Sequence, residues 1–205
     1  KGDTTSLDCI CFEPDNAEVG WISAGNGVPW KTTDGGATWN TVAMPYHSFN
    51  SVACAGGGSN VVWLAGWNNQ PNHIVKVQDS GTPTWEQLAD STYGNDPSFN
   101  GVDCSSGSQA LAVGASSHVA FTTNGGTSWG HRSYTAPREY LTAIQFLDLR
   151  TGYVCAGNSV YKSTNAGATW TPTASAGATG VLYALSFLDA NTGWAVGSSG
   201  QIFKT

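Results

Sequence analysis

Apolar side chains recur in one fixed pattern five times along the 205-residue chain. Each set occupies positions i, i+3 and i+5, and its last two members alternate as in a half-buried strand. A second apolar segment, which ends in glycine, follows each set at 20–25, 62–66, 111–114, 152–157 and 193–197. The pattern predicts two neighbouring short strands in every repeat, and no stretch has the periodicity of a helix. The five sets are Leu7/Ile10/Phe12, Phe49/Val52/Cys54, Phe99/Val102/Cys104, Leu141/Ile144/Phe146 and Leu182/Leu185/Phe187.

A polar turn motif lies between these apolar units. Segments 32–39, 122–129 and 163–170 are nearly identical, and 77–85 is a degenerate fourth copy with one extra residue. Each has an Asp or Asn followed by small residues that tolerate left-handed backbone, as a tight hairpin turn requires. The Trp that follows starts the next strand and can pack over the turn. We expect a structural role for these eight positions: Asp34, Trp39, Asp79, Trp85, Asn124, Trp129, Asn165 and Trp170.

Repetition every 41 to 45 residues, with strands A to D in each repeat, predicts an all-β fold. Four-stranded repeats of this length are typical of a β-propeller. We expect a single propeller domain over 1–205, with blades at about 6–47, 48–97, 98–139 and 140–180. A partial fifth blade at 181–205 stops before its own turn motif. Because open strand edges tend to pair with other chains, we expect self-association or a partner that completes this blade.

The two motifs together resemble the Asp-box (BNR) repeat family. The resemblance rests on 31–39 and on 193–205 and extends over essentially the whole chain. It is closest to the propellers of photosystem II assembly/stability factors, while sialidases, sortilin-type receptors and xyloglucanases share the turn. The resemblance implies a propeller but little about function, because the box is a turn rather than an active site.

A protein subunit is the partner of the photosystem II assembly relatives, whose binding face is Arg-rich. This chain has only three arginines, so we do not carry that partner over: Arg132, Arg138 and Arg150.

Charge and cysteine content narrow the function classes. The net charge is −6 and the eight Lys and Arg are dispersed, so the basic stripe of a nucleic-acid-binding protein is absent. No apolar run reaches the ~18 residues of a membrane span. A start at Lys1 without Met suggests a processed, extracytoplasmic or secreted product. The five cysteines lack zinc spacing and leave at least one thiol unpaired. We expect most to be small buried side chains, and a disulfide among the first four stays open.

In a propeller the A–B and C–D turns share one face, whereas the B–C and D–A loops surround the channel on the other. The Asp boxes are C–D turns, so we expect any ligand on the opposite, irregular loops. Trp67 has no counterpart in other repeats. Beside amide side chains it could stack on a sugar, or it could simply pack on a neighbouring loop. The candidate ligand-binding residues are Tyr46, His47, Trp67, Asn68, Asn69, His73, Tyr93, Arg138 and Tyr140.

A sialidase would need three arginines on the substrate carboxylate and a Tyr/Glu nucleophile pair. Arg150 lies in an A–B turn on the wrong face, and Glu139 and Tyr140 are strand neighbours that point to opposite sides. No other pair of carboxylates stands out among the candidates on the loop face or inner strands. These candidates are Asp90, Asp96, Asp103 and Glu139.

The histidines do not recur in register, so we expect surface positions and no metal site. They are His47, His73, His118 and His131. We therefore predict a non-catalytic binding or scaffold propeller without a cofactor, which recognises a protein or glycan on its loop face. Two alternatives stay open: a carbohydrate-binding lectin and a sialidase-like glycoside hydrolase fragment.

Overall fold

The computed structural model describes residues 6–25, 27–44, 48–67, 74–80, 84–87, 98–133, 140–173 and 179–204. These residues form an all-β protein of five small antiparallel sheets, with two single turns of 3₁₀ helix, η1 (Ala115–Ser117) and η2 (Ser198–Gly200). In every sheet the strands lie in chain order, as expected for short hairpin connections. The sheets are β1 (Leu7–Glu13), β2 (Asn16–Ala24), β3 (Trp30–Thr32) and β4 (Asn40–Thr41); β5 (Ser48–Cys54), β6 (Val61–Trp67), β7 (Ile74–Gln78) and β8 (Thr84–Gln87); β9 (Phe99–Ser106), β10 (Gln109–Gly114), β11 (His118–Thr122) and β12 (Gly130–Ser133); β13 (Leu141–Phe146), β14 (Gly152–Ala156), β15 (Ser159–Ser163) and β16 (Thr171–Pro172); and β17 (Leu182–Phe187), β18 (Gly193–Gly197) and β19 (Ile202–Lys204).

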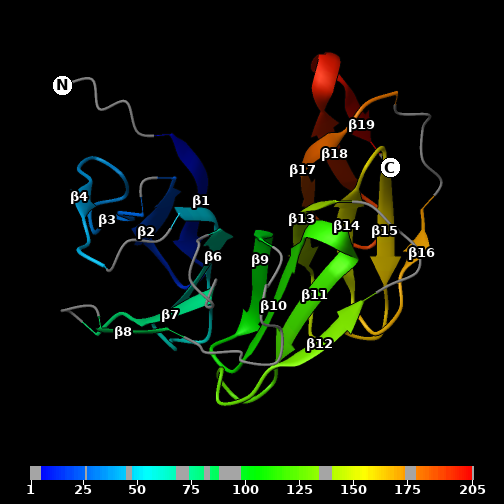
Figure 1. Cartoon of the computed structure of the whole chain (residues 1–205). Helices are drawn as coiled ribbons and strands as arrows, with labels where there is room; N and C mark the ends of the chain where they lie inside the picture. Colours follow the sequence, from blue (N-terminus) through cyan, green and yellow to red (C-terminus); the bar gives the residue numbers. More distant parts are fainter. Residues whose placement is uncertain are drawn as a thin grey trace.

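The five sheets are the blades of a β-propeller (Figure 1). The first strand of each blade is innermost, and these inner strands contact one another in succession: β1 with β5, β5 with β9, β9 with β13, and β13 with β17. Among the described residues, no comparable contact joins β17 back to β1. The blades therefore follow an arc, with the first blade in blue and the fifth in orange to red at its two ends (Figure 1).

The hydrophobic core lies between the blades. Trp63 on β6 and Ile74 on β7, in the second blade, pack against Phe99 and Val102 on β9, in the third blade. The ring of Trp63 meets that of Trp129 edge-on, with centroids 5.8 Å apart. Each strand thus presents alternate side chains to the preceding and the following blade. This burial on both faces explains the apolar pattern in the sequence.

The polar turn recurs with the same hydrogen bonds in three blades. In the first, Asp34 Oδ1 accepts from the Thr32 hydroxyl at 2.7 Å and from the Thr38 backbone N–H at 2.9 Å. The Gly36 N–H donates to Thr32 Oγ1 at 3.0 Å, and Gly35 takes the left-handed φ of 67° that the turn demands. Asn124 and Asn165 accept the corresponding backbone N–H groups at 3.0 and 2.8 Å. All of these bonds are local, so each turn can form within its own hairpin.

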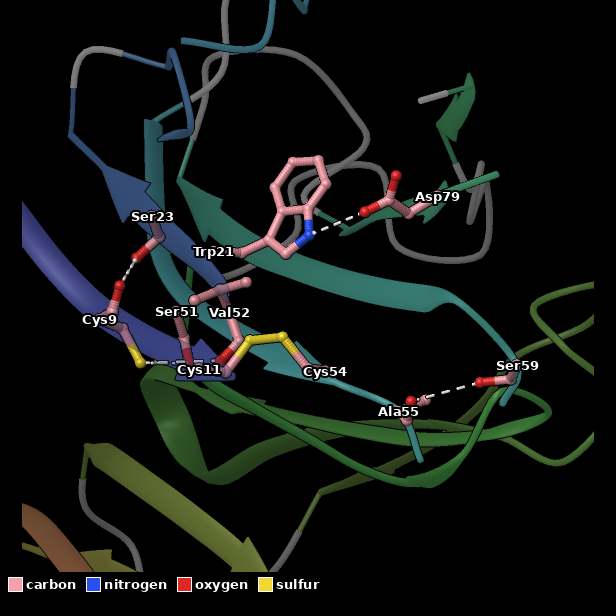
Figure 2. Close-up of a disulfide and its surroundings, with 10 residues drawn as sticks. All are labelled: Cys9, Cys11, Trp21, Ser23, Ser51, Val52, Cys54, Ala55, Ser59 and Asp79. Carbon is pink, nitrogen blue, oxygen red and sulfur yellow. Dashed lines mark hydrogen bonds between the residues drawn. A yellow bond between two sulfur atoms is a disulfide. The ribbon is translucent and has the colours of Figure 1, made fainter. Parts of the chain in front are cut away.

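Asp79, in the degenerate fourth copy, makes different contacts. Its buried carboxylate accepts from Lys31 Nζ at 2.6 Å. It also accepts from Trp21 Nε1 at 3.3 Å (Figure 2). Both partners belong to the first blade, so Asp79 links two blades. The rest of its turn, at 81–83, lies outside the described residues, as does the side chain of Trp85.

A disulfide between Cys11 and Cys54 joins β1 to β5 (Figure 2). Two other pairs of blades are linked at the corresponding positions by a polar side chain and a backbone group. Asp103 Oδ2 accepts from the Phe146 N–H at 2.5 Å, and Gln145 exchanges two hydrogen bonds with the Phe187 backbone. The disulfide therefore occupies a recurrent interblade position. Free thiols remain at Cys9, Cys104 and Cys155.

Candidate functional site: the channel mouth

Most of the predicted ligand-binding residues lie outside the described residues: Tyr46, His47, Asn68, Asn69, His73, Tyr93 and Arg138. Trp67 is the last residue of β6, where its backbone pairs with Ser48, and its side chain is not described. Tyr140 directly precedes β13 and is 66% exposed. Both positions are at the loop end of their blades, because β6 ends and β13 begins there.

A β-bulge interrupts every inner strand near this loop end. The pairing register skips one residue between Leu7 and Cys9, and it does so at the same place in the other four blades. A bulge leaves one residue unpaired and redirects its side chain. We call the five skipped residues the bulge ring: Asp8, Asn50, Asn100, Thr142 and Tyr183.

The bulges explain the apolar spacing in the sequence. Two residues on one face of a regular strand are two positions apart, but an inserted residue makes this spacing three. Leu141 and Ile144 thus face the same neighbouring blade although they are separated by two residues. The step from i to i+3 in the apolar pattern is the sequence signal of the bulge ring, which our candidate ligand-binding residues did not include.

Three members of the bulge ring link successive blades. Asn50 Nδ2 donates to the Phe99 carbonyl at 2.8 Å, and Asn100 Nδ2 donates to the Leu141 carbonyl at 2.9 Å. The Thr142 hydroxyl donates to the Leu182 carbonyl at 2.7 Å. These bonds use the amide donors of both asparagines. Within the described part of the chain, the Oδ1 acceptors of Asn50 and Asn100 have no partner.

The bulge ring and the adjoining residues of all five inner strands line a cavity of about 400 Å³. Its mouth also presents the Asp8 carboxylate, whose pKa is raised by partial burial, and the Tyr183 side chain, which is 58% exposed. Hydrogen-bond acceptors thus dominate the described mouth, and the chain carries a net charge of −6. Such a surface suits ligand groups that bring N–H donors or positive charge.

Replacing Asp8 by Asn is expected to raise the free energy of unfolding by about 1 kcal/mol at pH 7. The new amide would donate to the Phe49 carbonyl. Asn50 and Asn100 donate in the same way to the equivalent carbonyls of Phe99 and Leu141, whereas an ionised carboxylate has no proton to donate. Urea denaturation measures the gain, which should shrink in acid because a protonated Asp8 has its own donor. The matched variant Asn50→Asp should lower the free energy of unfolding by a similar amount. An Asp8→Asn variant with unchanged stability would contradict the equivalence of these positions.

A second, smaller pocket of about 120 Å³ lies between the third and fourth blades. Asp103, Phe121 and Arg132 line it, with Leu149 and Ala166 from the turns of the fourth blade. Burial raises the pKa of Asp103 to about 6, although backbone N–H donors oppose the shift. In contrast, hydrogen bonds from Thr38 and Thr32 lower the pKa of the exposed Asp34 to about 2.

The expectation that the histidines lie on the surface is wrong for His118. This side chain is only 4% exposed, because it packs against Phe99 at the interface of two blades. Its Nε2 lies 2.9 Å from Nδ1 of His131. His47 and His73 lie outside the described residues. Among the residues that the structure describes, no three His, Cys, Asp or Glu converge as metal ligands.

Comparison with known proteins places the chain by its fold. No protein-family profile and no curated protein sequence matches it. YCF48 from Cyanidioschyzon merolae superposes with a TM-score of 0.52 at 17% identity, covering 98% of this chain and 95% of YCF48. A structure of YCF48 bound to D1 peptide gives 0.53 at 14% identity, over 98% of this chain and 93% of that chain.

Two larger proteins match the arc of blades over part of their length. U3-55K superposes with a TM-score of 0.78 at 12% identity, over all of this chain and 62% of U3-55K. An ancestral GH74 enzyme gives 0.68 at 15% identity, over 97% of this chain and 31% of the enzyme. These likenesses establish the propeller fold.

No helix in the described residues is long and apolar enough to cross a membrane.

Proposed function

We propose that this chain is a non-catalytic binding propeller of the Asp-box (BNR) type, which holds a polypeptide segment at the mouth of its channel on the B–C/D–A loop face. The observation that carries the proposal is the bulge ring. The skipped residues of all five inner strands line the same cavity, and among the described residues the amide oxygens of Asn50 and Asn100 have no partner. The Asp-box assignment is supported by the hydrogen-bonded turns at Asp34, Asn124 and Asn165.

The chemistry of the mouth indicates the kind of segment. Asn50 Oδ1, Asn100 Oδ1 and the Asp8 carboxylate are hydrogen-bond acceptors that a ligand can use, while Tyr183 adds an exposed ring with a hydroxyl. An extended polypeptide supplies backbone N–H groups, and Lys or Arg side chains add charge that complements an acidic chain. We therefore propose a basic protein segment as the ligand. YCF48, which has a similar fold, has been solved with a bound peptide.

Several observations favour binding over catalysis. The described carboxylates on the channel wall are Asp8 and Asp103, and they belong to the first and third blades. Asp103 is partly neutral near pH 6 and engaged with backbone N–H groups. The likeness to a GH74 enzyme at 15% identity concerns the fold alone. Trp67 remains the residue that a lectin would use, and a glycan-binding function stays an alternative for the same loop face.

The Cys11–Cys54 disulfide supports an extracytoplasmic location for this protein. Disulfides persist in oxidising compartments and are rare in the cytosol. We propose that the propeller works in such a compartment. Thiol alkylation of the protein from its native source would test this, because a fully reduced pair would contradict the proposed location.

A fluorescence-polarisation titration tests the proposed ligand class. Two labelled peptides of equal length, one alternating Lys with Ser and one alternating Glu with Ser, are titrated with the protein at physiological salt. The Lys peptide should bind, and Asp8→Lys should weaken its binding at least tenfold. The control substitution Asp189→Lys, in an A–B turn on the opposite face, reverses the same charge and should leave binding unchanged.

A gentler variant isolates the bulge ring. Thr142 shows that threonine can make the interblade bond at this position, so Asn100→Thr keeps that bond and removes the amide oxygen. It should weaken peptide binding several-fold without lowering the melting temperature. Equal affinity for both peptides, or equal effects of Asp8→Lys and Asp189→Lys, would refute the proposed site. Binding to a glycan array that is lost in Trp67→Ala would favour the lectin.

A further inference from the structure

One position on strand B carries an aromatic ring in four of the five blades. The pairing register defines this position, because its backbone is opposite one residue of strand A and one residue of strand C. In the third blade the equivalent residue is Leu111, which lies between Asp103 and Phe121. The four aromatic residues are Trp21, Trp63, Tyr153 and Trp194.

The ring at this position packs on the following blade. In the fourth blade Tyr153 is 1% exposed, and its ring stacks on that of Phe187 with centroids 3.6 Å apart. Its hydroxyl donates to the Ala190 carbonyl, in a turn of the fifth blade, at 2.8 Å. In the first blade the ring N–H of Trp21 donates to Asp79 of the second blade. A polar edge of the ring therefore bonds to the next blade in both cases.

Leu111 packs on the fourth blade in the same direction, but its side chain is shorter. It belongs to the core cluster that contains Leu141 and Ile144. Its Cδ1 lies 3.2 Å from the position of a Cβ on Gly167, in the turn of the fourth blade. A leucine has no ring that extends beyond this contact, and Leu111 lines the pocket of about 120 Å³ between the two blades. The third blade thus lacks the ring that the other blades supply.

Phe121 does not take the place of the missing ring. It occupies a strand C position that is lysine in the other four blades. Its ring lies over β12, where it leaves no room for a Cβ on Gly130. The Arg132 guanidinium covers the ring, 4.0 Å from its centroid. Phe121 is therefore held as a wall of the pocket and does not fill it.

The pocket has the size and the lining of a site for one aromatic ring. An apolar cavity of about 150 Å³ holds a benzene molecule, and this pocket of about 120 Å³ is mainly apolar. One of its walls is Phe146. Phe146 is the counterpart of Phe187, since each pairs with the glycine that begins strand B of its blade. A ring in the pocket can therefore stack on Phe146 as Tyr153 stacks on Phe187.

A backbone acceptor suits a hydroxyl group on such a ring. Leu149, which lines the pocket, is the counterpart of Ala190. The preceding residues, Asp148 and Asp189, accept hydrogen bonds from the backbone of their turns in the same way. The Ala190 carbonyl accepts from the hydroxyl of Tyr153. Within the described residues the Leu149 carbonyl accepts no hydrogen bond.

The charged groups of the pocket favour a neutral ligand. The Asp103 carboxylate in its wall repels an anion. The Arg132 guanidinium is already engaged, because it covers Phe121 and donates to the Ala166 carbonyl at 3.4 Å. A phenol is neutral at physiological pH, since its pKa is about 10. Its hydroxyl can donate to the Leu149 carbonyl or to Asp103.

We propose that the pocket between the third and fourth blades binds a phenol, whose ring takes the place that Tyr153 fills in the fourth blade. The ring stacks on Phe146 beside Leu111, and its hydroxyl donates to the Leu149 carbonyl. Turns of both blades line the site, so it is on the Asp-box face and not at the bulge ring. A small phenolic molecule and the tyrosine side chain of a protein both supply this chemistry.

NMR titration of the isotope-labelled protein with p-cresol tests the site. Backbone signals of Leu149 and Thr122 should shift, whereas those of the bulge ring should not. Toluene, which lacks the hydroxyl, should bind at least tenfold more weakly. N-acetyltyrosinamide distinguishes the two sources of the phenol. An affinity like that of p-cresol identifies a tyrosine side chain whose backbone stays outside the pocket, and weaker binding identifies a small molecule.

Two substitutions remove the site in different ways. Leu111→Tyr supplies the missing ring from within the chain, so it should abolish p-cresol binding and raise the melting temperature by about 3 °C. Leu149→Asp removes an apolar wall without disturbing the core, because Leu149 is 55% exposed, and it should weaken binding several-fold. Leu188→Asp is the matched control. Leu188 is 71% exposed in a turn of the fifth blade and does not line the pocket, so binding should be unchanged.

Absence of p-cresol binding to the wild type would overturn the proposal, and so would equal affinity for toluene. A folded Leu111→Tyr variant that still binds p-cresol would also overturn it. Should this variant fail to fold, equal binding by Leu149→Asp and Leu188→Asp would count against the site. Leu111→Tyr should keep the affinity of the channel mouth for the Lys peptide. Failure of one site is therefore distinguishable from failure of the other.

Discussion

Replacing Cys11 and Cys54 together by serine is expected to lower the free energy of unfolding by about 4 kcal/mol. The disulfide closes a loop across a sequence separation of 43 residues. In the chain-entropy description this restricts the unfolded chain, and a loop of such length gives a stabilisation near the upper end of the usual range. The variant should keep its fold, because other blades use hydrogen bonds at the same position. Urea denaturation of wild type and variant measures the difference.

Reduction provides the control for this prediction. The wild type in excess reductant should become as unstable as the double variant, whereas the variant should not respond. Cys9→Ser should leave the response unchanged, because Cys9 is free. Titration of the native protein with a thiol reagent under denaturing, non-reducing conditions should find three thiols. Five thiols, or a reductant-insensitive wild type, would show that the disulfide does not form.

Replacing Asp103 by Asn is expected to remove a pH dependence of stability of about 2 kcal/mol. The folded-state pKa of Asp103 is raised to about 6 by burial, so the folded protein holds this proton more tightly than the unfolded chain. The stabilisation that comes from this tighter proton binding is complete below the ordinary carboxyl pKa and is lost as the pH rises through about 6. The full shift corresponds to about 3 kcal/mol, and partial exposure to the interblade pocket reduces it.

The fourth blade supplies the reverse experiment for Asp103. Gln145 occupies the equivalent position and bonds to the Phe187 backbone through both its donor and its acceptor. Gln145→Glu should introduce a loss of stability with rising pH like the one that Asp103→Asn removes. Denaturation midpoints between pH 4 and pH 8 test both variants. A wild type whose stability is flat over this range, or rises through pH 6, would contradict the assignment.

Local interactions explain which parts of the fold could be predicted from sequence. The turns at Asp34, Asn124 and Asn165 form between residues at most four apart, so their side chains carry the information. Asp79 looked like a fourth turn of this kind. Its carboxylate instead bonds to Trp21 and Lys31, which are 58 and 48 residues away, and that choice requires two packed blades.

Burial of single side chains was harder to predict. His118 has no register with other histidines, and its burial depends on where β11 meets Phe99 of a different strand. The cysteine pairing was equally open, because four cysteines lie in the first three inner strands. Cys11 and Cys54 pair because adjacent inner strands bring their Cα atoms to 5.8 Å.

By itself, the sequence determined the all-β repeat, the hairpin turns and the presence of a fifth blade, since each depends on contacts within one repeat. The tertiary structure decided which residues meet between repeats. It placed the bulge ring at one mouth of the channel and selected the disulfide partners. The physical reason is that each blade packs on its neighbours through two faces, and a pattern that repeats along the sequence does not specify which side chains of different repeats come into contact.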